Sequence, residues 1–354
     1  MNVKLVEEIA NAVLYEGYML YPYRTSSVKN RQRWNFGVIY PKDYSEAQKG
    51  VDLWYSQTEC LMEGDGETRF SVKVRFLQGI NRTISEPQIP LDELPENPEM
   101  HFRSVSTLRI GGQRLQTWQE ATEQEIVVPP LSLRTLAATP LKLSFEFPAK
   151  REFEAVRGAD GRIAGLIRRE RKSIRGKVEV TATCLGDGIH KVTLLVSNQL
   201  PLTDLQQSSR EQALLHSLLS AHSILSVAHG GFISLLDPPE EFREFVSACS
   251  NVGTWPVLAG EEGQRGTMLS SPIILYDYPQ IAPESAGNLF DGTEIDEILA
   301  LRILTLTDDE KSEMREGDER AREILERTEA LPAEQFAKLH GTLRGLHPAS
   351  EEPS

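Results

Sequence analysis

Cysteine and histidine are the residue types of this chain with the clearest potential for metal chemistry. The chain has three widely separated cysteines without a CxxC spacing: Cys60, Cys184 and Cys249. Three histidines lie in or just beyond one segment expected to be helical, but they stand six and seven residues apart: His216, His222 and His229. Ligands on one helix need a spacing of three or four residues. A nickel or zinc site would therefore need long-range convergence, with Cys60, Cys249 and His222 as candidates. The alternative is that all three are core residues.

Carboxylates near aromatic residues are the second group that could do chemistry. Asp277, Glu284 and Glu294 could act as acid and base. Helix capping explains such carboxylates more simply, because acidic residues favour the first turn of a helix. The glycine-rich stretch 253–263 lacks the lysine and hydroxyl of a phosphate-binding loop. An enzyme therefore ranks last among the functions considered, and no catalytic residue is predicted.

An aromatic and basic segment near the start of the chain is the strongest candidate for binding. Tyrosine, tryptophan and arginine dominate the hot spots of protein interfaces, and here they occur together with few carboxylates between them. The alternative is that the tyrosines line a half-buried strand. The predicted partner-binding residues are Tyr18, Tyr21, Tyr23, Arg24, Arg31, Arg33 and Trp34.

A second basic run occurs in the middle of the chain. Its cations are Arg168, Arg169, Arg171, Lys172, Arg175 and Lys177. We expect it to be the solvated face of a strand. Docking of an acidic partner is the alternative.

Alternating apolar residues predict that these groups are positioned mainly by antiparallel strands. A short apolar helix is expected over 3–14, followed by strands such as 70–76 and 141–147, in which every second residue is apolar. Three turn sequences, at 64–66, 160–161 and 187–188, predict hairpins. The region 30–200 is therefore expected to be a sandwich or an open barrel.

The pattern changes after Pro201. A capping box at Ser209 and Gln212 predicts a helix that continues to Leu225 and ends at Gly230. Further expected elements are a helix at 239–248, a strand at 273–276, a helix at 293–304 and an acidic helical segment opened by a capping box at 307 and 310. The predicted class is α+β, with a largely antiparallel β domain at 1–205, a mixed region packed on it at 206–306, an acidic helical segment at 307–330 and a flexible tail at 331–354.

Composition limits the classes of partner. The chain has 354 residues and a formal net charge of −14, so duplex phosphates would repel it and nucleic-acid binding is not expected. It lacks a stretch of about 18 apolar residues that could span a membrane, and its start does not resemble a signal peptide. Few, scattered cysteines suit a reducing compartment. We expect a cytoplasmic protein that does not insert into membranes.

Several long strings carry a resemblance to a known family. They are 13–18 with Tyr23, 29–31, 34–37, 253–257, 269–279 and 290–299. On these strings, over roughly residues 12–315, the chain resembles an uncharacterised bacterial protein family encoded near nickel-iron uptake hydrogenase and maturation genes. The resemblance implies a non-catalytic accessory, assembly or scaffold role that involves contact with a hydrogenase subunit or a maturation protein. The alternative is a metal-binding protein that delivers or senses nickel or zinc.

Overall fold

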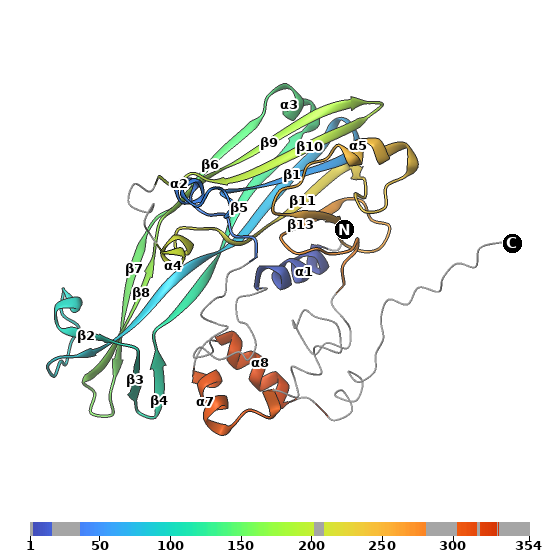
Figure 1. Cartoon of the computed structure of the whole chain (residues 1–354). Coiled ribbons are helices and arrows are strands. Elements are labelled where there is room, and N and C mark those ends of the chain that lie inside the picture. Colours follow the sequence, from blue (N-terminus) through green and yellow to red (C-terminus); the bar gives the residue numbers. More distant parts are fainter. Residues whose placement is uncertain are drawn as a thin grey trace. The chain divides into compact units, whose positions relative to one another are not determined.

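The computed structural model describes residues 3–15, 36–201, 209–280, 303–316, 319–330 and 332 (Figure 1). The chain divides into two compact units. The first comprises Met1–Tyr18 and Gln32–Pro279, and the second comprises Met19–Arg31 and Gln280–Ser354.

An eleven-stranded sheet forms the centre of the first unit, and its strands pair antiparallel. Its main path runs β12-β13-β11-β1-β10-β9-β6, while β2, β5, β7 and β8 pair off this path. The strands are β1 (Tyr55–Pro87), β2 (Phe102–Val105), β5 (Trp118–Ser132), β6 (Leu141–Phe147), β7 (Lys150–Arg157), β8 (Ile163–Arg171), β9 (Ile174–Gly186), β10 (Ile189–Asn198), β11 (Leu219–Phe232), β12 (Trp255–Leu258) and β13 (Thr267–Ser271). A separate hairpin pairs β3 (Thr107–Ile110) with β4 (Gln113–Gln116). The predicted β-rich α+β class is confirmed.

Strand β1 is the hub of this sheet. It pairs with β10 over 55–63, with β11 over 62–77, with β5 over 69–82 and with β8 over 80–85. Its inward side chains, such as Val72, Val74 and Phe76, join side chains of β9, β10 and β11 in one hydrophobic core. The alternation predicted for 70–76 is therefore confirmed.

The turn predicted at Gly64 is wrong, because β1 does not reverse there. The chain stays beside β11 on both sides of an irregularity between Gly64 and Arg69. The Asp65 carboxylate accepts hydrogen bonds from the amides of Glu67 and Thr68, at 2.9 and 3.0 Å. These residues therefore form a bulge that resembles a turn in sequence.

The other two predicted turns are confirmed. Strands β6 and β7 pair with β9 and β8 as two arms of one long hairpin, and Gly161 takes a φ of +81° at its tip. Strands β9 and β10 form the next hairpin, closed by Asp187 and Gly188, both with positive φ.

Short helices connect these strands. They are α2 (Lys42–Ala47), η2 (Pro98–Met100), α3 (Leu133–Ala138), α4 (Arg210–Leu214), η4 (Glu240–Phe242) and α5 (Arg243–Ser247). The pair η4 and α5 confirms the helix predicted at 239–248.

The long helix predicted after Ser209 is wrong beyond its first turns. The capping box of Ser209 and Gln212 is present, but α4 ends at Leu214 and the chain then enters β11. Residues 219–225 of β11 are buried on both faces, which gives an apolar run without strict alternation. Because β11 is hydrogen-bonded to β1, residues from both sides of the boundary expected at 205/206 lie in one sheet.

Helix α1 (Val3–Tyr15) packs beside β11, β1 and β13 and agrees with the predicted helix. Its buried face includes Val6, Ile9 and Val13. Arg75 Nη2 donates to Asn11 Oδ1 at 2.7 Å, and Ser220 Oγ donates to the carbonyl of Val13 at 2.9 Å. Apolar burial and two polar contacts therefore anchor α1 to the sheet.

Two helices are described in the second unit, α7 (Asp308–Glu316) and α8 (Glu319–Glu329). The capping box of Thr307 and Glu310 is present, with bonds of 2.9 and 3.3 Å, and the helical segment predicted there is confirmed. Ile303, Met314 and Leu325 form its small core. The helix predicted at 293–304 lies almost wholly outside the described residues, as does the tail predicted at 331–354.

Candidate partner-binding groove

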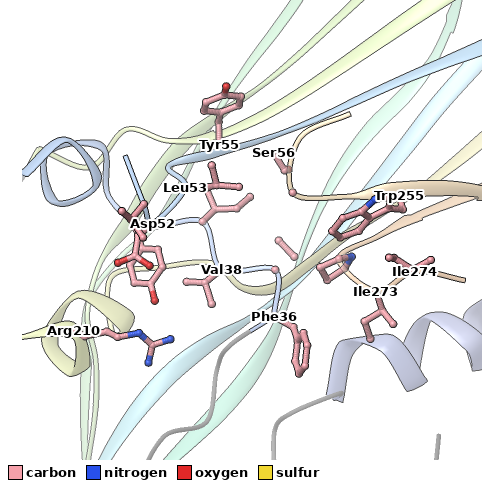
Figure 2. Close-up of a pocket in the computed structure, with 17 residues that line it drawn as sticks. Phe36, Val38, Asp52, Leu53, Tyr55, Ser56, Arg210, Trp255, Ile273 and Ile274 are labelled. Carbon is pink, nitrogen blue, oxygen red and sulfur yellow. The ribbon is translucent and has the colours of Figure 1, made fainter. Parts of the chain in front are cut away.

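A surface cavity of about 610 Å³ near one edge of the sheet is the best candidate for a functional site. We call it the Trp255 groove. Figure 2 shows Arg210 and Asp52 toward one end, Trp255, Ile273 and Ile274 at the other, and Val38 and Leu53 between them. The described residues that line it are Phe36, Gly37, Val38, Ile39, Tyr40, Val51, Asp52, Leu53, Tyr55, Ser56, Arg210, Ala221, Gly253, Trp255, Pro272, Ile273 and Ile274. Its volume lies in the range typical of ligand sites.

Three segments far apart in the sequence meet in this groove. Phe36 and Gly37 belong to the first, Gly253 and Trp255 to the second, and Pro272 with the residues after it to the third. Each segment is part of a string that carries the family resemblance. These strings are far apart in the sequence, and the fold brings residues of all three to one surface.

Two glycines allow the segments to approach each other. Gly37 has a φ of +54°, and a Cβ at this position would lie 2.5 Å from Pro272 Cγ. Gly253 has a φ of +68°, and its Cβ would lie 2.9 Å from Leu53 Cδ1. A larger residue at Gly37 would meet backbone strain and a clash with the Pro272 ring, whereas one at Gly253 would meet backbone strain and the flexible end of Leu53.

Buried hydroxyl groups hold the loop before Trp255 against β1 and β13. Thr254 Oγ1 lies 2.6 Å from Ser270 Oγ, which in turn lies 2.7 Å from Thr58 Oγ1 on β1. The Glu59 carboxylate accepts a hydrogen bond of 2.8 Å from the Ser250 amide and pairs with Lys191. These contacts position Trp255 at the end of a rigid strand.

The polar end of the groove is built on stacked tyrosines. The rings of Tyr40 and Tyr44 lie 5.3 Å apart at 26°. Burial raises the pKa of Tyr40 to about 12, against the opposing effect of Arg210, which hydrogen-bonds to its side chain. Burial and the nearby Asp52 carboxylate also raise the pKa of Tyr44. Both hydroxyls are therefore neutral at physiological pH.

The apolar end is exposed to an unusual degree. Trp255 is 45% exposed, Phe36 43% and Ile274 73%. Apolar residues exposed together in one groove make it a candidate for interaction, whereas single exposed apolar residues need no explanation.

The seven predicted partner-binding residues, Tyr18, Tyr21, Tyr23, Arg24, Arg31, Arg33 and Trp34, lie outside the described residues. Their role stays a prediction. The described chain resumes at Phe36, which lines the groove.

The structure brings two of the three predicted metal ligands near each other, because Cys249 contributes to the raised pKa of Cys60. Cys60 belongs to the main core, whereas Cys249 packs with Leu61, whose side chain lies on the opposite face of β1. His222 pairs with Arg75 on β1, beyond the bulge. Within the described ranges, no group of three histidine, cysteine or acidic residues is arranged to hold a metal ion.

The protonation of these three residues follows from burial. Burial raises the pKa of the Cys60 thiol and, less strongly, that of Cys249, to about 11. Burial, with a smaller effect of Arg75, lowers the pKa of His222 to about 4. At neutral pH the thiols are protonated and His222 is uncharged. A metal would have to displace the two thiol protons to bind thiolate.

Asp277, the first candidate for acid–base chemistry, fixes the chain at the sheet edge. Its Oδ1 accepts a hydrogen bond of 2.7 Å from the Leu258 amide, and its Oδ2 accepts one of 2.5 Å from Ser234 Oγ. Glu284 and Glu294 lie outside the described residues. The strand predicted at 273–276 is wrong, because the strand of this region is β13 and the chain leaves it at Ser271.

Four of the six cations in the basic run of β8, β9 and their connection pair with carboxylates. Arg168 Nη1 lies 2.6 Å from Glu99 Oε1, and Arg169 lies 2.9 Å from Glu120 and 2.6 Å from Glu154. Lys172 and Arg175 pair with Glu170 and Glu146. These pairs support the solvated-face interpretation rather than docking of an acidic partner.

Comparison with known proteins does not assign the chain to a family. No protein-family model matches it, and no curated protein matches it either. None of the helices in the described ranges is both long enough and apolar enough to cross a membrane.

Sequence reasoning missed Arg210, Asp52 and Ile274 as groove residues. Arg210 and Asp52 are isolated charges that reach the groove only through the fold. Ile274 lies inside the string 269–279 that carries the resemblance. Membership of that string was the sequence signal that could have pointed to it.

Proposed function

We propose that this protein is a non-catalytic accessory, assembly or scaffold protein that acts through protein–protein contact at the Trp255 groove. One observation carries the proposal. The three strings 34–37, 253–257 and 269–279, on which the family resemblance is based, each contribute residues to one apolar, exposed surface. A large aromatic side chain on a fixed strand is the kind of residue that contributes most to an interface.

The proposed partner is a hydrogenase subunit or a maturation protein, in the cytoplasm. This part of the proposal follows from the family resemblance. The aromatic and basic segment that ends at Trp34 is proposed as a further contact, because its residue types are those of interface hot spots. Replacement of Arg31 and Trp34 together should weaken partner binding by a few kcal/mol if both are hot spots.

Delivery or sensing of nickel or zinc is the second candidate. Cys249 lies near enough to raise the pKa of Cys60, but within the described residues no third ligand completes the group. This second candidate therefore serves as a measurable alternative in the experiment below.

The test is affinity purification of the tagged full-length protein from its native host, with elemental analysis of the same eluate. We expect the wild-type protein to recover hydrogenase or maturation proteins and Trp255→Ala to lose them. Tyr276→Ala is the matched control, because Tyr276 is an aromatic residue that is 87% exposed and does not line the groove. Equal recovery by Trp255→Ala and the wild type would refute the groove as the contact site. Stoichiometric metal that disappears in Cys60→Ser or Cys249→Ser would favour the second candidate.

A further inference from the structure

We infer that the Trp255 groove binds an uncharged, proline-rich segment of its partner in the polyproline II conformation. This inference rests on the function proposed above and specifies the chemistry of the occupant.

The charge of the lining favours an uncharged occupant. Arg210 and Asp52 are the only charged residues among the described residues of the groove, and their charges cancel. The chain as a whole has a formal net charge of −14. The groove is thus a neutral area of an acidic protein, complementary to a segment without charged side chains.

The shape of the lining favours proline. Three accessible aromatic rings contribute to the groove: Phe36, Tyr55 and Trp255. Grooves lined by aromatic residues bind proline-rich segments, whose preformed helix loses little conformational entropy on binding. Ile273 and Ile274 extend the apolar surface at the Trp255 end (Figure 2).

Free hydrogen-bonding groups in the groove match the carbonyls of such a segment. Within the described part of the chain, neither the Trp255 indole N–H nor the Ser56 hydroxyl makes a hydrogen bond. A polyproline II segment has no internal hydrogen bonds and presents its carbonyl oxygens as acceptors. The indole N–H can only donate, so its required partner is an acceptor.

The edge of the sheet beside the groove is closed to an added strand. β12 is the last strand of the main path, and its outer edge would otherwise be open. The Leu258 amide donates to Asp277 Oδ1, and the Leu258 carbonyl accepts from the Tyr278 amide, both at 2.7 Å. Pro256 has no N–H to offer. A bound segment therefore has to be recognised through side chains rather than by strand addition to β12.

The test uses the full-length protein and two synthetic peptides with blocked ends and no charge. The first repeats Pro-Pro-Leu over nine residues, and the second replaces every proline with alanine. Binding is followed by isothermal titration calorimetry and by the ¹H–¹⁵N signal of the Trp255 indole. We expect saturable binding of the proline peptide with a shift of that signal, and binding of the alanine peptide weaker by at least about tenfold.

Two variants locate the site. Trp255→Ala should reduce the affinity for the proline peptide by at least about tenfold, whereas Tyr276→Ala should bind it like the wild type. Equal binding of the two peptides by the wild-type protein would overturn the inference, and this comparison does not depend on any variant. If Trp255→Ala loses the cellular partner while the wild type ignores the proline peptide, the proposed function stands and the proline-rich occupant is refuted. If the variant keeps the partner and the peptide does not bind, both are refuted.

Discussion

The basic run on β8 and the Trp255 groove are both at the surface, yet they differ in how their side chains are satisfied. On β8 and β9, Arg169 and Arg175 pair with carboxylates of other strands, and Arg168 pairs with Glu99 of η2. In the groove, Trp255 is 45% exposed and Ile274 73% exposed. These three arginines are thus paired with carboxylates within the fold, whereas the apolar side chains of the groove remain exposed.

This difference shows which surface is available to a partner. An exposed ion pair contributes little to stability, and it leaves no unsatisfied charge for a partner to neutralise. Exposed apolar area keeps its full potential for burial. Groups without partners are therefore the informative ones, and the predictions below test them against the paired groups.

The largest expected effect concerns a buried group without a partner. His222 Nε2 is buried beside Arg75 and has no hydrogen-bond partner among the described residues. Because burial lowers its pKa to about 4 from 6.5, the unfolded chain binds a proton between these pH values that the folded chain does not. The His222 contribution to stability is fully present above pH 6.5 and is lost as the pH falls to 4, by about 3 kcal/mol.

Urea unfolding at pH 7, 5.5 and 4 measures this loss. His222→Gln should remove most of the His222-dependent slope. His229→Asn is the control, because His229 is exposed and its positive φ of 60° suits asparagine. The same pH slope in His222→Gln and in the wild type would contradict the assignment.

The second effect concerns the groove itself. Trp255→Ala should weaken partner binding by about 2 kcal/mol, because a hot-spot ring is truncated. The melting temperature should change little, since Trp255 is 45% exposed. Binding isotherms with the purified partner and thermal unfolding separate the two quantities. A large fall in the melting temperature would show that Trp255 is structural.

The third effect tests the close approach that shapes the groove. Gly37→Ala should lower the free energy of unfolding by about 1–3 kcal/mol, from a positive φ and from the clash with Pro272. Gly111→Ala is a matched control, because Gly111 has a φ of +57° but no neighbouring atom within 4 Å of its Cβ position. The difference between the variants isolates the clash. If the two variants lose the same free energy of unfolding, Pro272 can move away from the added Cβ at no measurable cost.

The smallest effect is expected on β8. Arg168→Gln breaks the pair with Glu99, whose side chains are 28% and 46% exposed, and should cost less than about 1 kcal/mol. Recovery of the partner should be unchanged. Loss of partner binding in this variant would contradict this expectation. It would show that the basic run is part of the partner-binding surface.

The sequence was sufficient for elements whose determinants are local. Alternation over 70–76, the turns at Gly161 and Gly188, and the capping boxes at Ser209 and Thr307 depend on neighbouring residues. β11 was mistaken for a helix because α1 and the core bury it on both sides, a fact set by residues distant in sequence. Gly64 was mistaken for a hairpin turn because bulges use the same residue types.

The candidate site could be predicted only in pieces. Phe36, Trp255 and Pro272 were all within strings singled out beforehand, but their meeting depends on the order of strands in the sheet. Arg210 and Asp52 carried no local pattern at all. Strand order follows from long-range pairing, which one sequence does not reveal.

The pairing of β1 has a consequence for synthesis on the ribosome. β1 is complete by residue 87, but its neighbours β10 and β11 end at 198 and 232. β5 can cover residues 69–82 on one edge of β1 once residue 132 has been made. The edges of β1 that β10 and β11 cover stay open while well over a hundred residues are added, a state prone to association with other chains because such distant pairing closes slowly.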